Sequence, residues 1–265
     1  MNNGYWDQRG RLSYTYKGEI FYTITPLPYY LKRRELLLKK LNLLINSMDS
    51  KPGSQIKIAD FGSGDGYYCC WLAKKFAESN IYGYDISESM IKKARKRADS
   101  QSISNVRFIC DDIAHEKLKF DVILIMMVFQ HFRADNAVKR KISRMKELLK
   151  RDGKIILFEA TARRKVKIDE MIRRPERFYM DIFQDHHFKL VEKEYISFPF
   201  FLKYQNTFLK TWKKVLKGTE AEKCIRINKN MFLKTLNEFV FFLGSFADKF
   251  MSEGKEGYTL FVFEK

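Results

Sequence analysis

Cysteine is scarce in this sequence, with four residues among 265. Four cysteines in a chain of this length do not form a disulfide framework, and the adjacent Cys69 and Cys70 cannot easily bridge to each other. We therefore expect reduced and mostly buried thiols. Histidine is equally rare, and the pair His186 and His187 offers too few ligands for a metal site, so no metal is expected.

Long hydrophobic runs are also absent. The longest, Val122–Phe129 and the segment around Phe239–Leu243, fall well short of the ~20 residues that a helix needs to span a bilayer. The first residues lack the basic and then apolar pattern of a secretory signal. These absences predict a cytoplasmic protein that does not cross a membrane.

Acidic residues are outnumbered, because 32 Asp and Glu face 50 Lys and Arg, for a net charge of +18. The excess is spread along the chain and no basic tail holds it. It predicts an anionic partner, such as nucleic acid, a phosphorylated substrate or a membrane surface, or else a solvated surface. With 45% hydrophobic residues the chain can bury a sizeable core, which excludes a disordered protein.

Short apolar runs alternate with helical patterns between residues 56 and 160. The pattern predicts strands over 56–61, 81–85, 106–110, 120–128 and 154–159, and helices over 66–78, 88–99 and 135–150. Strand and helix alternation with short connections favours right-handed crossovers and a parallel sheet that is covered on both faces. The predicted fold class is α/β, doubly wound.

The flanks depart from this alternation. An aromatic-rich segment precedes an amphipathic helix over 31–48, whereas a helix near 169–184 and strands near 188–198 and 258–263 follow the core. The resulting organisation has four parts: an aromatic cap and helix over 1–50, a core over 51–200, a helical basic and aromatic insert over 201–256, and a final core strand over 257–265.

The predicted insert contains an apolar stripe at helical spacing, with lysines largely off it. Its members are Phe201, Tyr204, Phe208, Trp212 and Val215. Such a basic amphipathic helix lies in an anionic membrane interface, follows nucleic acid or packs its stripe on the protein. All three alternatives stay open at this point.

The segment Asp60–Gly66, DFGSGDG, links the first core strand to a helix, where an open α/β sheet binds ligands. A dinucleotide fingerprint needs G-x-G-x-x-G, but Tyr67 stands at the position of the last glycine. Asp65 would also place a carboxylate beside a pyrophosphate. The loop therefore favours a phosphate-free nucleoside with positive charge that Asp60 or Asp65 tolerates, and S-adenosylmethionine (SAM) has these properties.

Motifs across residues 56–160 resemble the class I SAM-dependent methyltransferases, including their type 11 and type 25 groups. They are the glycine loop Asp60–Gly66, Asp85 after the second strand, Phe108–Ile113, Phe120–Phe132 and Leu149–Leu157, in the family's order and spacing. The resemblance implies a Rossmann-like seven-stranded sheet whose last strand is antiparallel. It also implies SAM as the cofactor and S-adenosylhomocysteine (SAH) as the product.

The resemblance further implies roles for individual residues in cofactor binding. Gly62, Gly64 and Gly66 would lie against the methionine part of SAM, and Asp60 and the backbone near Ile125 would face its ammonium. Asp85 and its neighbour Ile86 would bind the ribose. Asp112 and the amide of Ile113 would bind the adenine. Two simpler interpretations stay open. Asp112 would cap a turn or helix, and Asp85 would cap the helix that begins near Ser87.

Methyl transfer is an in-line displacement that needs a base only when the nucleophile carries a poorly acidic proton. His131 follows the fourth strand at the carboxyl edge of the sheet and is the leading candidate base. Glu159, at the end of the fifth strand, is the second candidate. Alternatively, His131 is structural, and Glu159 binds hydroxyls or pairs with Arg163 or Arg164.

Candidate acceptor-binding residues are Tyr16, Tyr22, Met127 and Arg163. The two tyrosines belong to an aromatic segment that in related enzymes folds over SAM, although it would equally serve to pack the first helix. Met127 stands where amide and base methyltransferases carry an Asn-Pro-Pro-Tyr motif, which disfavours methylation of adenine or glutamine amides.

The overall layout is loosely similar to bacterial surface-glycan and O-antigen methyltransferases. That similarity implies O-methylation of a sugar or glycan hydroxyl, on an acceptor that can be lipid-linked at the inner, anionic face of the membrane. The alternatives are methylation of another small molecule or of RNA, with nucleic acid disfavoured, and a non-catalytic SAM-binding scaffold.

Overall fold

The computed structural model describes residues 14–16, 19–21, 27–48, 55–168, 171–196 and 257–265, together with a few single residues between 214 and 239. Among them, residues 44–48, 55–168, 171–195 and 258–265 form one compact unit, which we call the core unit. Tyr22, the side chain of Tyr16 and the apolar stripe of the predicted insert lie outside the described residues.

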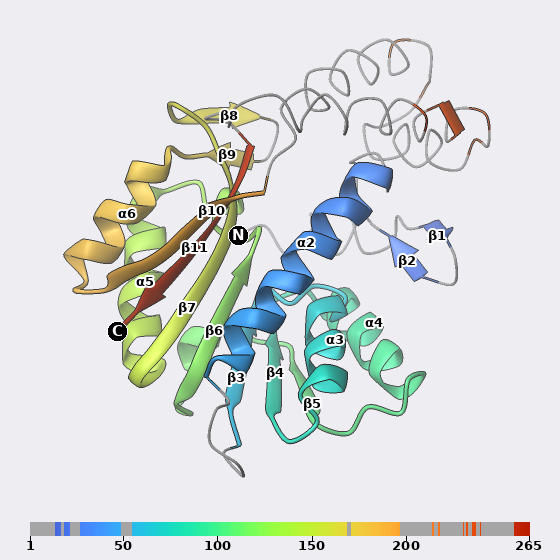
Figure 1. Cartoon of the computed structure of the whole chain (residues 1–265), viewed down its shortest axis with the longest axis horizontal. Coiled ribbons are helices and arrows are strands. Elements are labelled where there is room, and N and C mark those ends of the chain that lie inside the picture. Colours follow the sequence, from blue (N-terminus) through green and yellow to red (C-terminus); the bar gives the residue numbers. More distant parts are fainter. Residues whose placement is uncertain are drawn as a thin grey trace. The chain divides into compact units, whose positions relative to one another are not determined.

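Seven strands form one mixed sheet in the order β10-β11-β7-β6-β3-β4-β5 (Figure 1). Their bounds are β3 Lys57–Phe61, β4 Asn80–Tyr84, β5 Val106–Ile109, β6 Phe120–Met126, β7 Leu149–Thr161, β10 Lys189–Tyr195 and β11 Gly257–Glu264. Strand β3 pairs in parallel with both β4 and β6, and β10 runs antiparallel to β11. The doubly wound fold and its antiparallel last strand are thus confirmed.

Because the chain runs from β3 outward to β5 and then returns to β6 on the other side, the strand order reverses at β3. The carboxyl ends of β3, β4 and β6 therefore flank a topological switch point, where open α/β sheets bind their ligands. This edge of the sheet is called the carboxyl edge.

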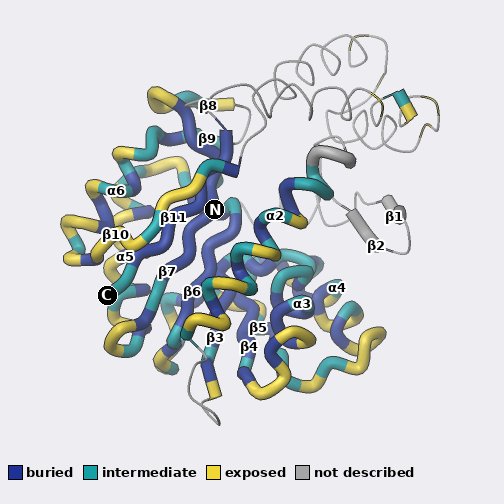
Figure 2. The backbone as a smooth tube through the Cα atoms, in the orientation of Figure 1, coloured by how far each residue is buried: buried dark blue, intermediate teal, exposed yellow. Residues whose placement is uncertain are grey.

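Helices cover both faces of the sheet. In the core unit these helices are α3 Tyr67–Lys75, α4 Glu88–Asp99, α5 Asp135–Leu148 and α6 Glu176–Asp185, with single 3₁₀ turns at η1 Ile113–His115 and η2 Phe129–His131. Helix α2, Leu27–Asn46, belongs for most of its length to the second unit. Apolar residues of α5 and α6 pack in one cluster with alternate residues of β3, β4, β6, β7 and β11. Burial on both faces explains why the central strands are almost uniformly apolar, and Figure 2 shows the buried sheet between partly exposed helices.

Two hairpins were not predicted. Strands β1 Tyr14–Tyr16 and β2 Glu19–Phe21 pair within the aromatic segment, and β8 Val166–Ile168 pairs with β9 Met171–Arg173 where the sequence predicted the start of a helix. That helix, α6, begins only after Pro175, because a proline disfavours helical conformation in the residue before it.

Three cysteines are described, and all are free: Cys69 and Cys70 are buried, and Cys110 is exposed. Among the described helices, none has both the length and the apolarity that crossing a bilayer requires.

Candidate active site

The loop after β3 depends on three glycines with positive φ, which are Gly62 at 75°, Gly64 at 54° and Gly66 at 74°. Such angles are costly for residues that carry a Cβ. The amide of Gly62 donates to Tyr84 O at 2.8 Å, so the loop folds back onto the end of β4.

The glycines differ in the space around them. A Cβ at Gly66 would lie 2.6 Å from Phe108 Cζ, and one at Gly62 would lie 2.6 Å from Val128 Cγ2. A Cβ at Gly64 would meet nothing within 4 Å. Packing thus dictates glycine at two positions, whereas at Gly64 the backbone faces open space in which a ligand can lie against it.

Asp60 ends β3 as a buried carboxylate with only 1% of its surface exposed. Its Oδ2 accepts a hydrogen bond from Cys69 Sγ at 3.3 Å, but no partner for Oδ1 exists among the described residues. Burial raises the pKa of Asp60 from 3.8 to about 7. Because an unpaired buried carboxylate oxygen is unfavourable, the site fits a cationic group such as the ammonium of SAM.

Asp85 follows β4 and is held by both of its oxygens. Oδ2 accepts from the amide of Gly64 at 2.9 Å and Oδ1 from the amide of Ser87 at 2.9 Å. Ser87 itself caps α4 by accepting from the Met90 amide. Asp85 therefore joins the glycine loop to the start of α4, with Ile86 half-buried beside it, and its role at the ribose stays a prediction.

Asp112 shows the capping geometry that the sequence left open as an alternative. Its Oδ1 accepts from the Ala114 amide at 2.9 Å, and Lys141 Nζ reaches its two oxygens at 2.5 and 2.6 Å. Lys141 comes from α5 and lies over the ring of Phe61. The adenine role of Asp112 stays a prediction, as do those of Ile113 and Ile125, whose side chains are fully buried.

Asp65 has a charged partner within the protein. It forms an ion pair with Arg97 of α4, and Arg97 Nε also donates to the backbone oxygen of Asp65 at 3.1 Å. Because Arg97 offsets the charge of this carboxylate, the expected effects of Asp65 on a pyrophosphate or a cofactor cation stay predictions. Asp60 forms no such ion pair among the described residues and is the stronger candidate for the second role.

His131 lies in the 3₁₀ turn η2 and is half-buried. Its Nε2 is 3.2 Å from Nε2 of Gln130, which also donates to the backbone oxygen of Met127 at 3.1 Å. The amide nitrogen of Gln130 can only donate, so this contact is a hydrogen bond only in the tautomer whose Nε2 carries no proton. A base at this atom requires that tautomer, and an acceptor hydroxyl has to displace the Gln130 contact.

Glu159 is fully buried at the end of β7. Its Oε1 accepts from the Phe129 amide at 2.6 Å and its Oε2 from the Gln130 amide at 3.2 Å. Burial raises its pKa from 4.5 to about 8, against the opposing effect of these amides. Glu159 pairs with neither Arg163 nor Arg164, both of which are exposed, and this geometry favours a structural role over proton abstraction.

Met127 marks the end of β6 at the carboxyl edge. It has a positive φ of 65°, which is strained for a residue with a side chain, and its amide donates to Phe158 O at 2.8 Å. The strain ends the strand two residues earlier than predicted and turns the chain into η2. The acceptor-binding roles of Met127, half-buried, and of Arg163 stay predictions.

Residues 52–223 match a family model described as a methyltransferase domain. The match covers more than half of the chain. The chain belongs to this methyltransferase family. The expected class I SAM-dependent methyltransferase and its cofactor, SAM, are thereby confirmed.

Curated relatives cover only part of the chain. A malonyl-[acyl-carrier protein] O-methyltransferase of Bacillus anthracis is 34% identical over 124 residues, 45% of this chain and 44% of that protein. A carboxy-S-adenosyl-L-methionine synthase of Nautilia profundicola is 27% identical over 148 residues, 56% of this chain and 60% of that protein. The chain therefore spans less than two thirds of the length of each.

A solved mycolic acid cyclopropane synthase, complexed with SAH and CTAB, has a similar fold. Its TM-score is 0.63 at 16% identity, over 98% of this chain and 94% of that one. At this level of identity the similarity concerns the fold alone.

Replacing glycines of the loop should separate packing from ligand contact. Gly66→Ala should lower the free energy of unfolding by about 1–3 kcal/mol more than Gly64→Ala, because Gly66 lacks room for a Cβ and Gly64 does not. Gly64→Ala should instead weaken SAH binding. Denaturant titration and calorimetry measure the two effects, and equal destabilisation by both variants would contradict this account of the loop.

The buried acids should make stability fall as the pH rises. Folding raises the pKa of Asp60 from 3.8 to about 7 and that of Glu159 from 4.5 to about 8, so the folded state binds more protons than the unfolded state between these values. Their stabilising effect is present below pH 4 and is lost as the pH passes 7 and 8. Asp60→Asn and Glu159→Gln should each flatten the dependence of Tm on pH, measured by thermal melts from pH 5 to 9.

Asp85→Asn should weaken SAH binding about 10- to 150-fold, the range expected when a hydrogen bond of a charged group is lost. Asp121→Asn is the matched control, since Asp121 starts β6 at the opposite edge and pairs with Lys150. Calorimetry should find near wild-type affinity in the control. Equal weakening in both variants would exclude a specific role for Asp85.

Proposed function

We propose that this protein transfers the methyl group of SAM to an oxygen nucleophile of a small molecule. The observation that carries the proposal is the cradle at the switch point, in which one short segment provides both the open backbone at Gly64 and the unpaired buried oxygen of Asp60. Asp85 borders the same loop. A cradle of this kind suits a cationic nucleoside better than a dinucleotide with its pyrophosphate.

When bound, SAM supplies an electrophilic methyl group on a sulfonium. Asp60 would hold its ammonium group and Asp85 its ribose, while the loop Gly62–Gly66 would lie against its methionine part. The chain's remaining task is to align the acceptor oxygen with that methyl group and to exclude water, which supplies much of the rate enhancement in such displacements.

A hydroxyl acceptor needs a base, and His131 is the proposed one. The tautomer whose Nε2 carries no proton can act as this base, and η2 carries the ring at the end of β6. Proton removal at that atom would accompany attack by the hydroxyl oxygen. A sugar or glycan hydroxyl, in surface polysaccharide synthesis, is the acceptor of this class that we propose first.

A carboxylate acceptor is the second candidate, and it needs no base. The malonyl-[acyl-carrier protein] O-methyltransferases among the relatives favour it. So do Arg163, Arg164 and Lys167, three exposed cations around β8 that form no ion pair among the described residues. Such cations suit a negatively charged acceptor or its phosphate-bearing carrier.

Labelled SAM tests the proposal directly. The protein is incubated with methyl-labelled SAM and separate pools of lipid-linked glycan, nucleotide sugars, malonyl-acyl carrier protein and RNA. Label in a small-molecule oxygen supports the proposal. Label in RNA with steeply salt-dependent binding, or SAM binding without label anywhere, would replace it with the RNA or scaffold alternative.

The two acceptor classes predict opposite effects of substitution. For a hydroxyl acceptor, His131→Asn should lower kcat about 10²- to 10⁴-fold, as loss of a general base does. For a carboxylate acceptor, the double variant Arg163→Ala and Arg164→Ala should raise KM, while His131→Asn leaves kcat near wild type. His187→Asn, an exposed turn position with positive φ, is the control.

A further inference from the structure

The segment from Met127 to Phe132, which we call the acceptor loop, carries His131 but has few hydrogen bonds of its own. It leaves β6 through the left-handed Met127. Among the described residues its internal backbone hydrogen bonds are the 3₁₀ bonds of η2, such as His131 N to Val128 O at 3.0 Å, and the Gln130 side chain donates to Met127 O. Val128 at the start of η2 provides no side-chain cap. The first amides of η2 therefore need acceptors from elsewhere.

Glu159 supplies these acceptors from β7, 30 residues away along the chain. One oxygen binds the Phe129 amide at 2.6 Å and the other binds the Gln130 amide at 3.2 Å. The carboxylate thus acts as a long-range cap of η2. Because both oxygens face amides and the side chain has no exposed surface, Glu159 cannot touch an acceptor molecule.

Arg174 binds two backbone carbonyl groups of the acceptor loop. Its Nη1 donates to Phe129 O at 2.8 Å and its Nη2 to Phe132 O at 2.6 Å. Its Nε pairs with Asp135 at 2.8 Å, at the start of α5, and its side chain is fully buried. Its own backbone is fixed by a bridge to Thr161 at the end of β7.

We propose that Glu159 and Arg174 are positioning residues that fix the acceptor loop, and with it His131 and Met127, relative to the cofactor cradle. The acid side chain of Glu159 accepts from amides and the guanidinium of Arg174 donates to carbonyl groups of one short turn, and neither side chain reaches solvent. The loop is thereby set by the ends of β7 and β9 rather than by its own sequence. The proposal rests on the proposed function only for the chemical role of His131.

The positions of the His131 and Met127 side chains can be monitored by NMR in the absence of an acceptor molecule. In carbon-13 NMR spectra the imidazole signal of His131, one of four histidines, and the methyl signal of Met127 report on the loop. Glu159→Gln places a donor against an amide, and Arg174→Lys removes the two-carbonyl fork. Both variants should shift and broaden these two signals.

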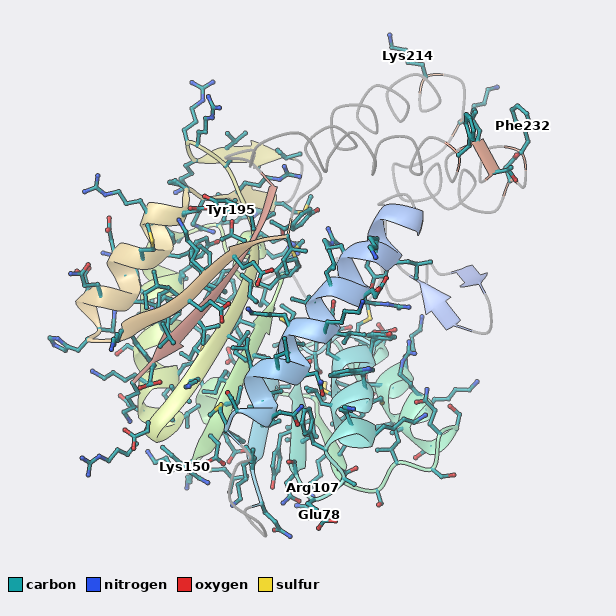
Figure 3. The ribbon with its side chains drawn as sticks, viewed as in Figure 1. Glu78, Arg107, Lys150, Tyr195, Lys214 and Phe232 are labelled. Carbon is teal, nitrogen blue, oxygen red and sulfur yellow. The ribbon has the colours of Figure 1, made fainter. Side chains whose placement is uncertain are left out.

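The exposed Glu78 and Arg107, labelled in Figure 3, supply the controls Glu78→Gln and Arg107→Lys. These two controls should leave the His131 and Met127 signals unchanged.

The kinetic readout separates positioning from stability. With the acceptor found by the labelling experiment, Glu159→Gln and Arg174→Lys should lower kcat on the order of 100-fold through misplacement of the loop. The SAH dissociation constant should change little, because the cradle is intact. Unchanged NMR signals in folded variants, or equal losses of SAH affinity and kcat, would overturn the proposal.

Two further measurements decide the matter if these variants fail to fold. In the wild type, the amides of Phe129 and Gln130 should be protected from hydrogen exchange. In Asp135→Asn, which weakens the outer bond of Arg174 together with the exposed Lys165 pair and leaves both carbonyl bonds of Arg174 intact, the His131 signal should shift by a smaller amount. Unprotected amides at Phe129 and Gln130 would refute the positioning role of Glu159. A negative labelling experiment would instead refute the proposed function and leave these readouts standing.

Discussion

Parallel pairing of β3 with both β4 and β6 is the constraint on which the rest of the site depends. It brings the carboxyl ends of three strands together, so that residues following each strand meet although they are far apart in sequence. Asp60, Asp85 and the acceptor loop share one edge for this reason. The glycine loop can then hydrogen-bond to the end of β4, since positive φ angles let it turn back within a few residues.

The carboxylates at this edge are balanced in different ways, and the differences separate their roles. Asp65 and Asp112 pair with Arg97 and Lys141, and Glu159 is held by backbone amides. Asp60 keeps one buried oxygen without a partner among the described residues. Burial of an unbalanced charge is unfavourable, so Asp60 is the carboxylate of this edge that we propose to be balanced by the ligand.

Much of the core could be predicted from the sequence. The apolar runs and their spacing predicted the strands β3 to β7 and the helices α3 to α5 to within a few residues, except that β7 begins five residues before the predicted strand, because such patterns reflect burial on a sheet or helix face. The cofactor loop was also visible, since its glycines are a local requirement. The β8 and β9 hairpin was missed because three-residue strands carry no periodicity.

The sequence by itself determined the fold class, the family and the place of the glycine loop, because these depend on local patterns of apolar residues and glycine. Only the tertiary structure decided which charges are satisfied. Arg97 neutralises Asp65, Lys141 binds Asp112, and Glu159 and Arg174 grip the acceptor loop, and each of these contacts joins residues about 30 or more positions apart. A side chain's role as ligand, cap or clamp is set by the partner that folding brings to it, and sequence spacing does not record that partner.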